Sequence, residues 1–509
     1  MRRTLLVRAL IAGALAALIL PASAMADFIR PDGTLAPGIP GSVAVDTLWV
    51  IVAAMVVMFM QAGFAFLEIG FSRGKNAGTV VAKILVNFSI AGIAYYFVGF
   101  ALAFGLGHQV LGMDLWGTKG FFLQGIGDPL KNFPAMGVSD ATIESKWFFQ
   151  FVFCAVSLAI VWGTTLERIK FGVYIIYAIV FASVIYPIGS HWVFGGGFLQ
   201  QGQEFKIFTD NYAKFGIQDF AGSTAVHLIG ATGALAALLH LGARKGKYGP
   251  DGKPRAIPGH NMPLFGLGVL ILWLGWFGFN PGSALSASDG RFPEILLVTQ
   301  IAACAGVLTA VATAYWKTKA IDIGMAGNGA IAALVAITAP SGYVELWTAP
   351  IIGGVAGIIV VLGVYWVDKH IDDPVGALSA HGMAGIWGTL SCGIFTAPRF
   401  AKYNAWGDPQ GGLWYSGHFV QLAGQTVGFA IAFTFVFILS YATFWVIKKT
   451  YGMRVTEEEE DAGLDISEHG MYGYPEQFIP APELVGYGAT PSTLSSMAGG
   501  TATTREVPA

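Results

Sequence analysis

The sequence predicts an all-α polytopic membrane protein with eleven transmembrane helices, arranged as two inverted repeats of five helices plus a long final helix. Hydrophobic residues make up 54% of the 509 residues and charged residues only 12%, whereas about a quarter of an average soluble protein is charged. Beyond residue 26, eleven apolar stretches approach the roughly 20 residues that a spanning helix needs. Basic residues gather in alternate loops, as the positive-inside tendency requires.

The first 26 residues have the pattern of a cleaved secretory signal peptide. Three arginines precede the apolar run 9–20, and a small-residue cleavage site follows at 24–26. This apolar run is too short for a membrane span. We therefore expect the mature chain to begin near Asp27, on the periplasmic side of the inner membrane.

The transmembrane domain is predicted to occupy residues 27–450. Its eleven spans are expected near 44–70, 80–106, 147–166, 171–194, 219–241, 261–282, 293–315, 321–339, 345–367, 377–396 and 418–447. An odd number of spans from a periplasmic start places the C-terminus in the cytoplasm. The long loops 107–146 and 195–218 would then be external, and the first cytoplasmic loop would carry Arg73, Lys75 and Lys83.

Two histidines lie inside predicted spans, His227 in the fifth and His381 in the tenth. Ionisable side chains at membrane depth are costly and are therefore candidates for function. The simpler alternative is that each one hydrogen-bonds a backbone carbonyl between packed helices. Spans one to five and six to ten begin on opposite sides of the membrane, so an inverted repeat would bring the two histidines together at the midplane.

The composition changes after the last span. Residues 451–475 are expected to form a cytoplasmic regulatory tail, in which the acidic run 457–461 is typical of a solvated helix face. The segment 463–470 has the sequence Gly-Leu-Asp-Ile-Ser-Glu-His-Gly. This sequence is more defined than a segment that serves only solubility would need. Residues 476–509 are rich in Pro, Ser, Thr, Gly and Ala, which is typical of disorder.

Several motifs together resemble the ammonium transporter (Amt/Mep/Rh) family, of the bacterial Amt type. They are Asp-Phe-Ala-Gly-Ser-Thr-Ala-Val-His at 219–227, Gly-Trp-Phe-Gly-Phe-Asn-Pro-Gly-Ser at 275–283, Asp-Asp-Pro at 372–374 with His-Gly at 381–382, Phe-Ala-Phe-Leu-Glu at 64–68 with Arg-Gly-Lys-Asn at 73–76, and Gly-Met-Arg-Val at 452–455 with Gly-Leu-Asp at 463–465. The resemblance covers roughly 44–470. It implies one pore per subunit, a homotrimer, ammonium or methylammonium as substrate, and a tail that binds a PII-type signalling protein in nitrogen metabolism.

The resemblance also implies roles for individual residues. An external ammonium recruitment site would comprise Phe153, Ser283 and the aromatic residue before the glycine triplet 195–197. Many bacterial members have Trp at that last position, whereas this chain has Phe194 with Trp192 two residues earlier. A phenyl ring binds cations less strongly than an indole, so Trp192 is a second candidate.

The remaining implied roles concern the pore. Phe153 with Phe279 would form a hydrophobic gate, and His227 with His381 would be the pore pair. Asp219 is expected to be a helix N-cap or structural anchor near the external mouth, on the capping preference of Asp.

The expected mechanism follows from the cost of burying a cation. Transfer of a small cation into a low-dielectric medium costs on the order of 20 kcal/mol, whereas each aromatic face contributes only about 0.5–2 kcal/mol. The aromatic rings can therefore bind the cation at the pore entrance, but they cannot compensate the cost of moving the charged ion through the pore. We expect deprotonation outside the gate, passage of neutral ammonia along the histidines, and reprotonation in the cytoplasm.

Two other functions remain open at this point, an ammonium sensor with little flux and an Rh-like ammonia gas channel. The sequence does not decide between net ammonia and electrogenic ammonium transport. An enzyme is not expected, because no span contains a His-Glu-x-x-His or paired Asp arrangement. No cofactor or metal is expected either, since the three cysteines lack a paired metal-ligand spacing. A net charge of −2 without a long basic block gives no sign of nucleic-acid binding.

Overall fold

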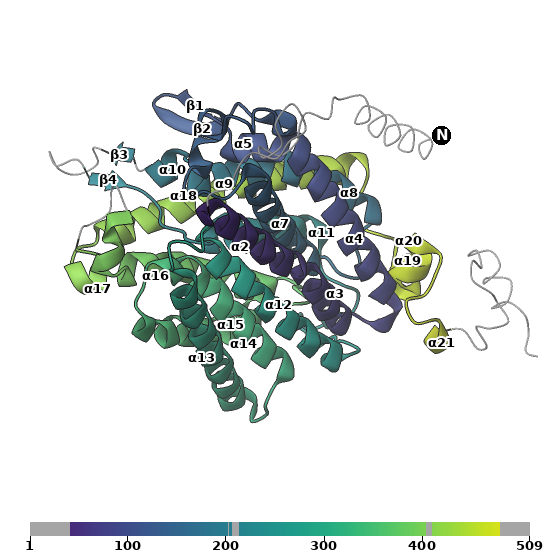
Figure 1. Ribbon diagram of the computed structural model, residues 1–509. Coiled ribbons are helices and arrows are strands. Elements are labelled where there is room, and N and C mark those ends of the chain that lie inside the picture. Colours follow the sequence, from purple (N-terminus) through teal and green to yellow (C-terminus); the bar gives the residue numbers. More distant parts are fainter. Residues whose placement is uncertain (1–40, 202, 206–212, 404–409, 479–509) are drawn as a thin grey trace, which may run out of the picture.

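The computed structural model describes residues 41–201, 203–205, 213–403 and 410–478. The predicted signal peptide, most of the predicted disordered segment and part of the loop 195–218 lie outside this range. The described part is a bundle of long helices (Figure 1). The main helices are α2 (Gly41–Met58), α3 (Met60–Phe71), α4 (Ala77–Ala94), α5 (Phe100–Phe104), α7 (Ile143–Gly163), α8 (Phe171–Val180), α9 (Tyr186–Phe194), α11 (Ile229–Leu241), α12 (Met262–Gly282), α13 (Phe292–Thr318), α14 (Ile323–Thr338), α15 (Ala349–Val367), α16 (Ala384–Phe395) and α18 (Val420–Thr450).

The smaller elements join these helices or follow them. Four π-helical turns are η2 (Tyr95–Gly99), η5 (Phe181–Ile185), η6 (Ser223–Leu228) and η9 (Leu378–Met383). Short helices are α6 (Pro129–Asn132), α10 (Phe198–Gln201), α17 (Leu413–Ser416), α19 (Glu457–Ala462), α20 (Leu464–His469) and α21 (Pro475–Phe478), and 3-10 turns are η1 (Gly74–Asn76), η3 (Phe121–Leu123), η4 (Pro134–Met136), η7 (Pro340–Gly342), η8 (Leu346–Thr348) and η10 (Pro398–Tyr403). Two antiparallel hairpins pair β1 (Gly107–Val110) with β2 (Met113–Gly117) and β3 (Gln203–Phe205) with β4 (Ala213–Phe215).

The helices confirm the predicted class, an all-α membrane protein. In the described part of the chain, nine helical stretches are long and apolar enough to cross a membrane. The predicted span 321–339 corresponds to α14, which is shorter, and the predicted span 377–396 corresponds to η9 with α16. The observed elements are therefore compatible with eleven spans.

Two helix–helix contacts of the first half recur in the second half. Within the first half, α4 packs on α8 and α7 packs on α11. The corresponding helices of the second half repeat these contacts, with α13 on α15 and α14 on α16. Helix α12 packs on α2 and α3, and the final helix α18 packs on both α11 and α16. This repetition agrees with the predicted pair of five-helix repeats.

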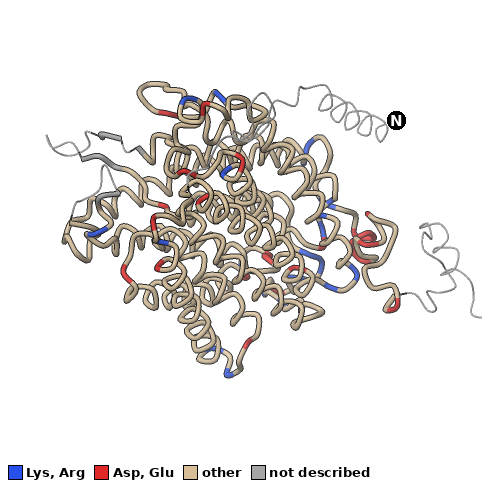
Figure 2. Tube along the Cα trace, in the orientation of Figure 1, with Lys and Arg blue, Asp and Glu red and all other residues tan. Residues whose placement is uncertain are grey.

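The bundle has two distinct ends. We call the end with β1 and β2 the hairpin end and the end with α19 and α20 the tail end. The second span runs from the tail end to the hairpin end. Its first element, η1, contacts α20, and its last element, α5, precedes β1. Charged residues gather in the loops at these ends and in the tail, while the middle of the bundle is largely free of them (Figure 2).

Lys83 departs from the prediction that it is a loop charge. It lies within α4, is 0% exposed, and its Nζ forms an ion pair with Glu68 of α3. The positive-inside pattern counts charges along the chain and does not detect a partner on a neighbouring helix. A paired charge can be buried where a single one would be too costly.

The tail packs against the tail end of the bundle. The Asp465 carboxylate accepts hydrogen bonds from the backbone N–H groups of Gly78, Thr79 and Gly473, at 2.8–2.9 Å, and from the Thr79 hydroxyl at 3.1 Å. Lys75 Nζ donates to two carbonyl oxygens of the acidic run, at 2.8 and 2.6 Å. These contacts join the segment 463–470 to the start of the second span.

Candidate functional site

Four side chains from four different elements form a column inside the bundle. The rings of Phe153 (α7) and Phe279 (α12) are stacked with centroids 3.9 Å apart and an interplanar angle of 19°. The His227 ring stacks on Phe279 at 5.4 Å, and the His381 ring stacks on His227 at 5.3 Å. All four side chains are buried. The column therefore continues from two apolar rings to two imidazoles.

The two imidazoles share a hydrogen bond. Nδ1 of His227 and Nδ1 of His381 are 3.2 Å apart. When both rings are neutral, one Nδ1 must donate and the other must accept, so the two rings adopt opposite tautomers. His227 Nε2 has no hydrogen-bond partner among the described residues. The pair is thus a polar contact in apolar surroundings.

Each histidine lies in a π-helical turn that follows a capping aspartate. Asp219 accepts from the backbone N–H groups of residues 222–225 at 2.7–3.0 Å, at the start of η6. Asp373 accepts from the N–H groups of residues 376 and 378 at 3.1 and 2.8 Å, at the start of η9. In both halves the histidine is the eighth residue after its aspartate. A π-helical turn in a helix frequently marks a functional site.

Asp373 was not among the predicted site residues, although the sequence contains a signal for it. The spacing from Asp219 to His227 is repeated from Asp373 to His381. The two aspartates differ in position, since Asp219 lies toward the hairpin end and Asp373 adjoins Asp372 near the tail end. This opposite placement is what an inverted repeat requires.

The proposed recruitment residues are not all in one place. Ser283 caps the C-terminus of α12, and its Oγ donates to Phe279 O at 2.8 Å, which leaves its oxygen lone pairs free to accept. Phe194 is partly buried between the main core and a smaller cluster. Trp192 belongs to that smaller cluster, where Nε1 donates to Leu115 O at 2.8 Å and the ring contacts Phe435 of α18. The structure thus places Trp192 in a different apolar cluster from the Phe153–Phe279 stack.

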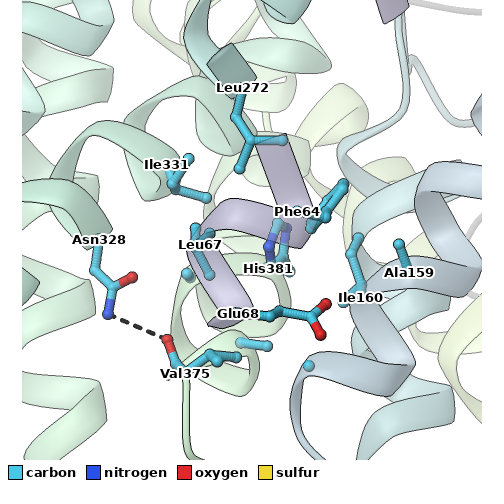
Figure 3. A pocket seen from close by; sticks show the side chains of 13 residues that line it. Phe64, Leu67, Glu68, Ala159, Ile160, Leu272, Asn328, Ile331, Val375 and His381 are labelled. Carbon is cyan, nitrogen blue, oxygen red and sulfur yellow. Dashed lines mark hydrogen bonds between the residues drawn. The ribbon is translucent and has the colours of Figure 1, made fainter. Parts of the chain in front are cut away.

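A cavity of about 20 Å³ adjoins His381 on the tail side (Figure 3). Its wall includes Phe64 and Glu68, one turn apart on α3, together with Asn328 and Val375. The Asn328 amide donates to Val375 O at 3.2 Å across this wall. In the sequence, Glu68 is only part of a family motif, and that motif does not indicate that Glu68 lies near His381.

A buried network of charges surrounds the tail end of the fifth span. Arg244 donates to the Asp372 carboxylate through its backbone N–H, Nε and Nη2, at 2.8–2.9 Å. Burial alone would raise the pKa of Asp372, but its hydrogen bonds with Arg244 and the nearby charge of Arg168 lower that pKa to about 2. Burial also opposes ionisation of Glu167, yet Arg244 and Arg73 hold the pKa of Glu167 below its usual value.

Comparisons with known proteins point to one family. The profile of the Ammonium Transporter Family matches residues 48–474. The ammonium transporter Amt2 of Archaeoglobus fulgidus is 43% identical over 471 residues, which are 92% of this chain and 95% of that protein. The ammonium transporter of Bacillus subtilis is 32% identical and matches 84% of this chain and 98% of its own length.

Two solved structures are also similar. One is titled "Sensor Amt Protein" and has 35% identity and a TM-score of 0.73, covering 84% of this chain and 99% of that one. The structure of Candida albicans Mep2 has 28% identity and a TM-score of 0.71, covering 82% and 87%. By the family match over most of its length and these close relatives, the chain belongs to the ammonium transporter family.

Proposed function

We propose that the protein moves ammonium across the membrane by removing its proton before the phenylalanine stack and passing neutral ammonia along the two histidines. The observation that carries this proposal is the 3.2 Å contact between the histidine Nδ1 atoms, immediately beyond two phenyl rings whose centroids are 3.9 Å apart. Rings stacked this closely leave no room for a hydrated ion between them.

The energetics favour neutral ammonia over the ion. The described column contains two phenyl and two imidazole rings and no carboxylate. Its groups cannot replace the hydration of a cation, which is worth on the order of 20 kcal/mol. A neutral imidazole pair can hydrogen-bond ammonia and pass a proton from one ring to the other.

The test uses the protein in proteoliposomes. Ammonium pulses are expected to produce currents on a solid-supported membrane, and labelled methylammonium is expected to accumulate in the vesicles. Potassium and sodium are expected to give no comparable current, because a path of this kind lacks the rings of carbonyls or carboxylates that select metal cations. Potassium currents as large as ammonium currents would overturn the proposal. Accumulation of methylammonium without current would instead indicate net transport of the neutral amine, as in a gas channel.

The cellular setting belongs to the same proposal. We place the protein in the inner membrane, with residues 1–26 removed, the hairpin end periplasmic and the tail 451–475 cytoplasmic, and three copies assembled as a homotrimer. The tail is proposed to bind a PII-type signalling protein that closes the pore when nitrogen is plentiful. Truncation after Gly452 should abolish binding of that protein, and native mass spectrometry should show three subunits per particle.

A sensor with little flux is the second candidate function. Two observations favour it: the docking of Asp465 on the start of the second span, which connects the tail to the bundle, and the similarity to a protein titled as a sensor. A sensor would bind ammonium and change the protection of the tail without transport. Hydrogen exchange of residues 463–470 with and without ammonium, measured beside uptake, separates the two functions.

A further inference from the structure

Glu68 is buried, and only one of its two carboxylate oxygens has a partner among the described residues. It is 1% exposed, and its Oε2 is paired with Lys83 Nζ, which also donates to Trp162 O at 3.2 Å. Its Oε1 has no hydrogen-bond partner among the described residues. An unsatisfied acceptor on a buried ionised group is costly, so it calls for an explanation.

Glu68 also lines the cavity beside His381. Figure 3 shows Glu68, Phe64 and His381 around that cavity. The centroids of the Phe64 and His381 rings are 6.5 Å apart. Gly163 lines the same cavity, and a Cβ at this position would lie 3.5 Å from Glu68 Oε1 and 3.1 Å from Val375 Cγ2. The absence of a side chain at Gly163 thus keeps space open next to the unpaired oxygen.

The volume of the cavity and the charges beside it limit which molecule can bind there. A cavity of about 20 Å³ has room for a single molecule as small as water, and ammonia is of that size. The Glu68–Lys83 pair is neutral as a whole, and Lys83 would repel a cation. A neutral molecule with N–H donors suits the site better, because it can donate to Glu68 Oε1 without adding charge.

We propose that Glu68 is a binding residue for neutral ammonia, which donates an N–H to Oε1 after it leaves His381. This inference rests on the proposed function and adds a stopping point on the tail side of the histidine pair. Most of the other side chains that line this cavity are apolar, and ammonia with its hydrogen bonds unmade is unfavourable there. Lys83 pairs with Oε2, which leaves Oε1 available to accept.

The first test compares two double variants that both lack the ion pair. Glu68→Gln with Lys83→Met retains a polar group in the cavity, whereas Glu68→Met with Lys83→Met does not. We expect the Met/Met variant to give ammonium-driven currents about tenfold smaller than the Gln/Met variant, the effect of one hydrogen bond. Melting temperatures of the two variants in detergent serve as the control for folding.

The second test is steric and leaves the charges in place. Gly163→Ala should narrow the cavity, so it should reduce uptake of methylammonium more than currents driven by ammonium. The matched control is Gly266→Ala in α12, because an added Cβ there meets nothing within 4 Å. A control variant that behaves like wild type shows that helix substitution alone does not change the ratio.

The outcomes are distinct. Equal currents in the two double variants, with the wild type active, would overturn the role of Glu68 and leave the proposed function standing; the cavity would then hold only water. An unchanged methylammonium to ammonium ratio in Gly163→Ala would also count against it. A wild-type protein without ammonium current or uptake would overturn the proposed function and this inference with it.

Discussion

The hydrogen bond between His227 and His381 predicts that the two residues act as one unit. The perturbation is a double-mutant cycle with His227→Ala, His381→Ala and the double variant. If a proton passes through the 3.2 Å Nδ1 contact, replacing either histidine removes the whole relay. The second replacement should then add little further loss, because residues that act together are non-additive.

The magnitude follows from the task of the pair. A positioned group that transfers a proton typically contributes about 10²–10⁴ in rate, so each single variant should lose at least about a hundredfold in ammonium-driven current. Independent residues would give a double variant that loses about 10⁴-fold. A shared relay gives a double variant within a few-fold of the singles. The coupling free energy would then be about 2.7 kcal/mol, the equivalent of a hundredfold change.

The assay is the peak current after an ammonium pulse in proteoliposomes with equal amounts of protein. His370→Ala is the matched control, because His370 is an exposed histidine outside the column. The contact itself contributes only about 0.5–1.5 kcal/mol to stability, so the variants should remain folded. Losses that simply add in the double variant would refute the relay and leave the histidines with independent roles.

Three further predictions concern other parts of the structure. Phe279→Ala removes a buried ring of the stack, so it should lower the free energy of unfolding by about 3–5 kcal/mol. It should also admit water to the path and so reduce the selectivity for ammonium over potassium. Unchanged selectivity would show that Phe279 is not part of the gate. Asp372→Asn should cost about 3–5 kcal/mol in thermal unfolding, because it removes the negative charge that pairs with the buried guanidinium groups of Arg168 and Arg244. The pKa of Asp372 is lowered from 3.8 to about 2. At pH values above 3.8 its ionised form should therefore stabilise the fold by roughly 2–3 kcal/mol, and the wild type should lose this stabilisation as the pH falls toward 2. Asp465→Ala should speed Glu-specific proteolysis of the acidic run about tenfold, the effect of losing hydrogen bonds to a charged group, whereas Asp251→Ala in an exposed loop should not.

Much of the architecture could be predicted from local properties of the chain. Apolar stretches of spanning length and their alternating loop charges depend on composition and order, which sequence contains directly. The predicted second span begins at residue 80, whereas the helical stretch begins at Gly74, since polar residues near its start are held by the tail. Even so, element type and order agree with the structure.

The placement of individual side chains depended on contacts between distant segments. Position in matching spans predicted that His227 and His381 would approach each other, but not that they meet through Nδ1, 154 residues apart in sequence. Trp192 was a candidate because it is close to Phe194 in the chain. Two residues apart on a helix point in different directions, so the indole packs toward α18 instead.

The sequence by itself therefore determined the class of protein, the order of its spans and the identity of the column residues. Only the tertiary structure decided that Lys83 is buried with Glu68 and that the free oxygen of Glu68 adjoins His381. The physical reason is that hydrophobicity and capping act within a few residues of the chain. Ion pairs, stacked rings and cavities depend instead on how separate helices pack.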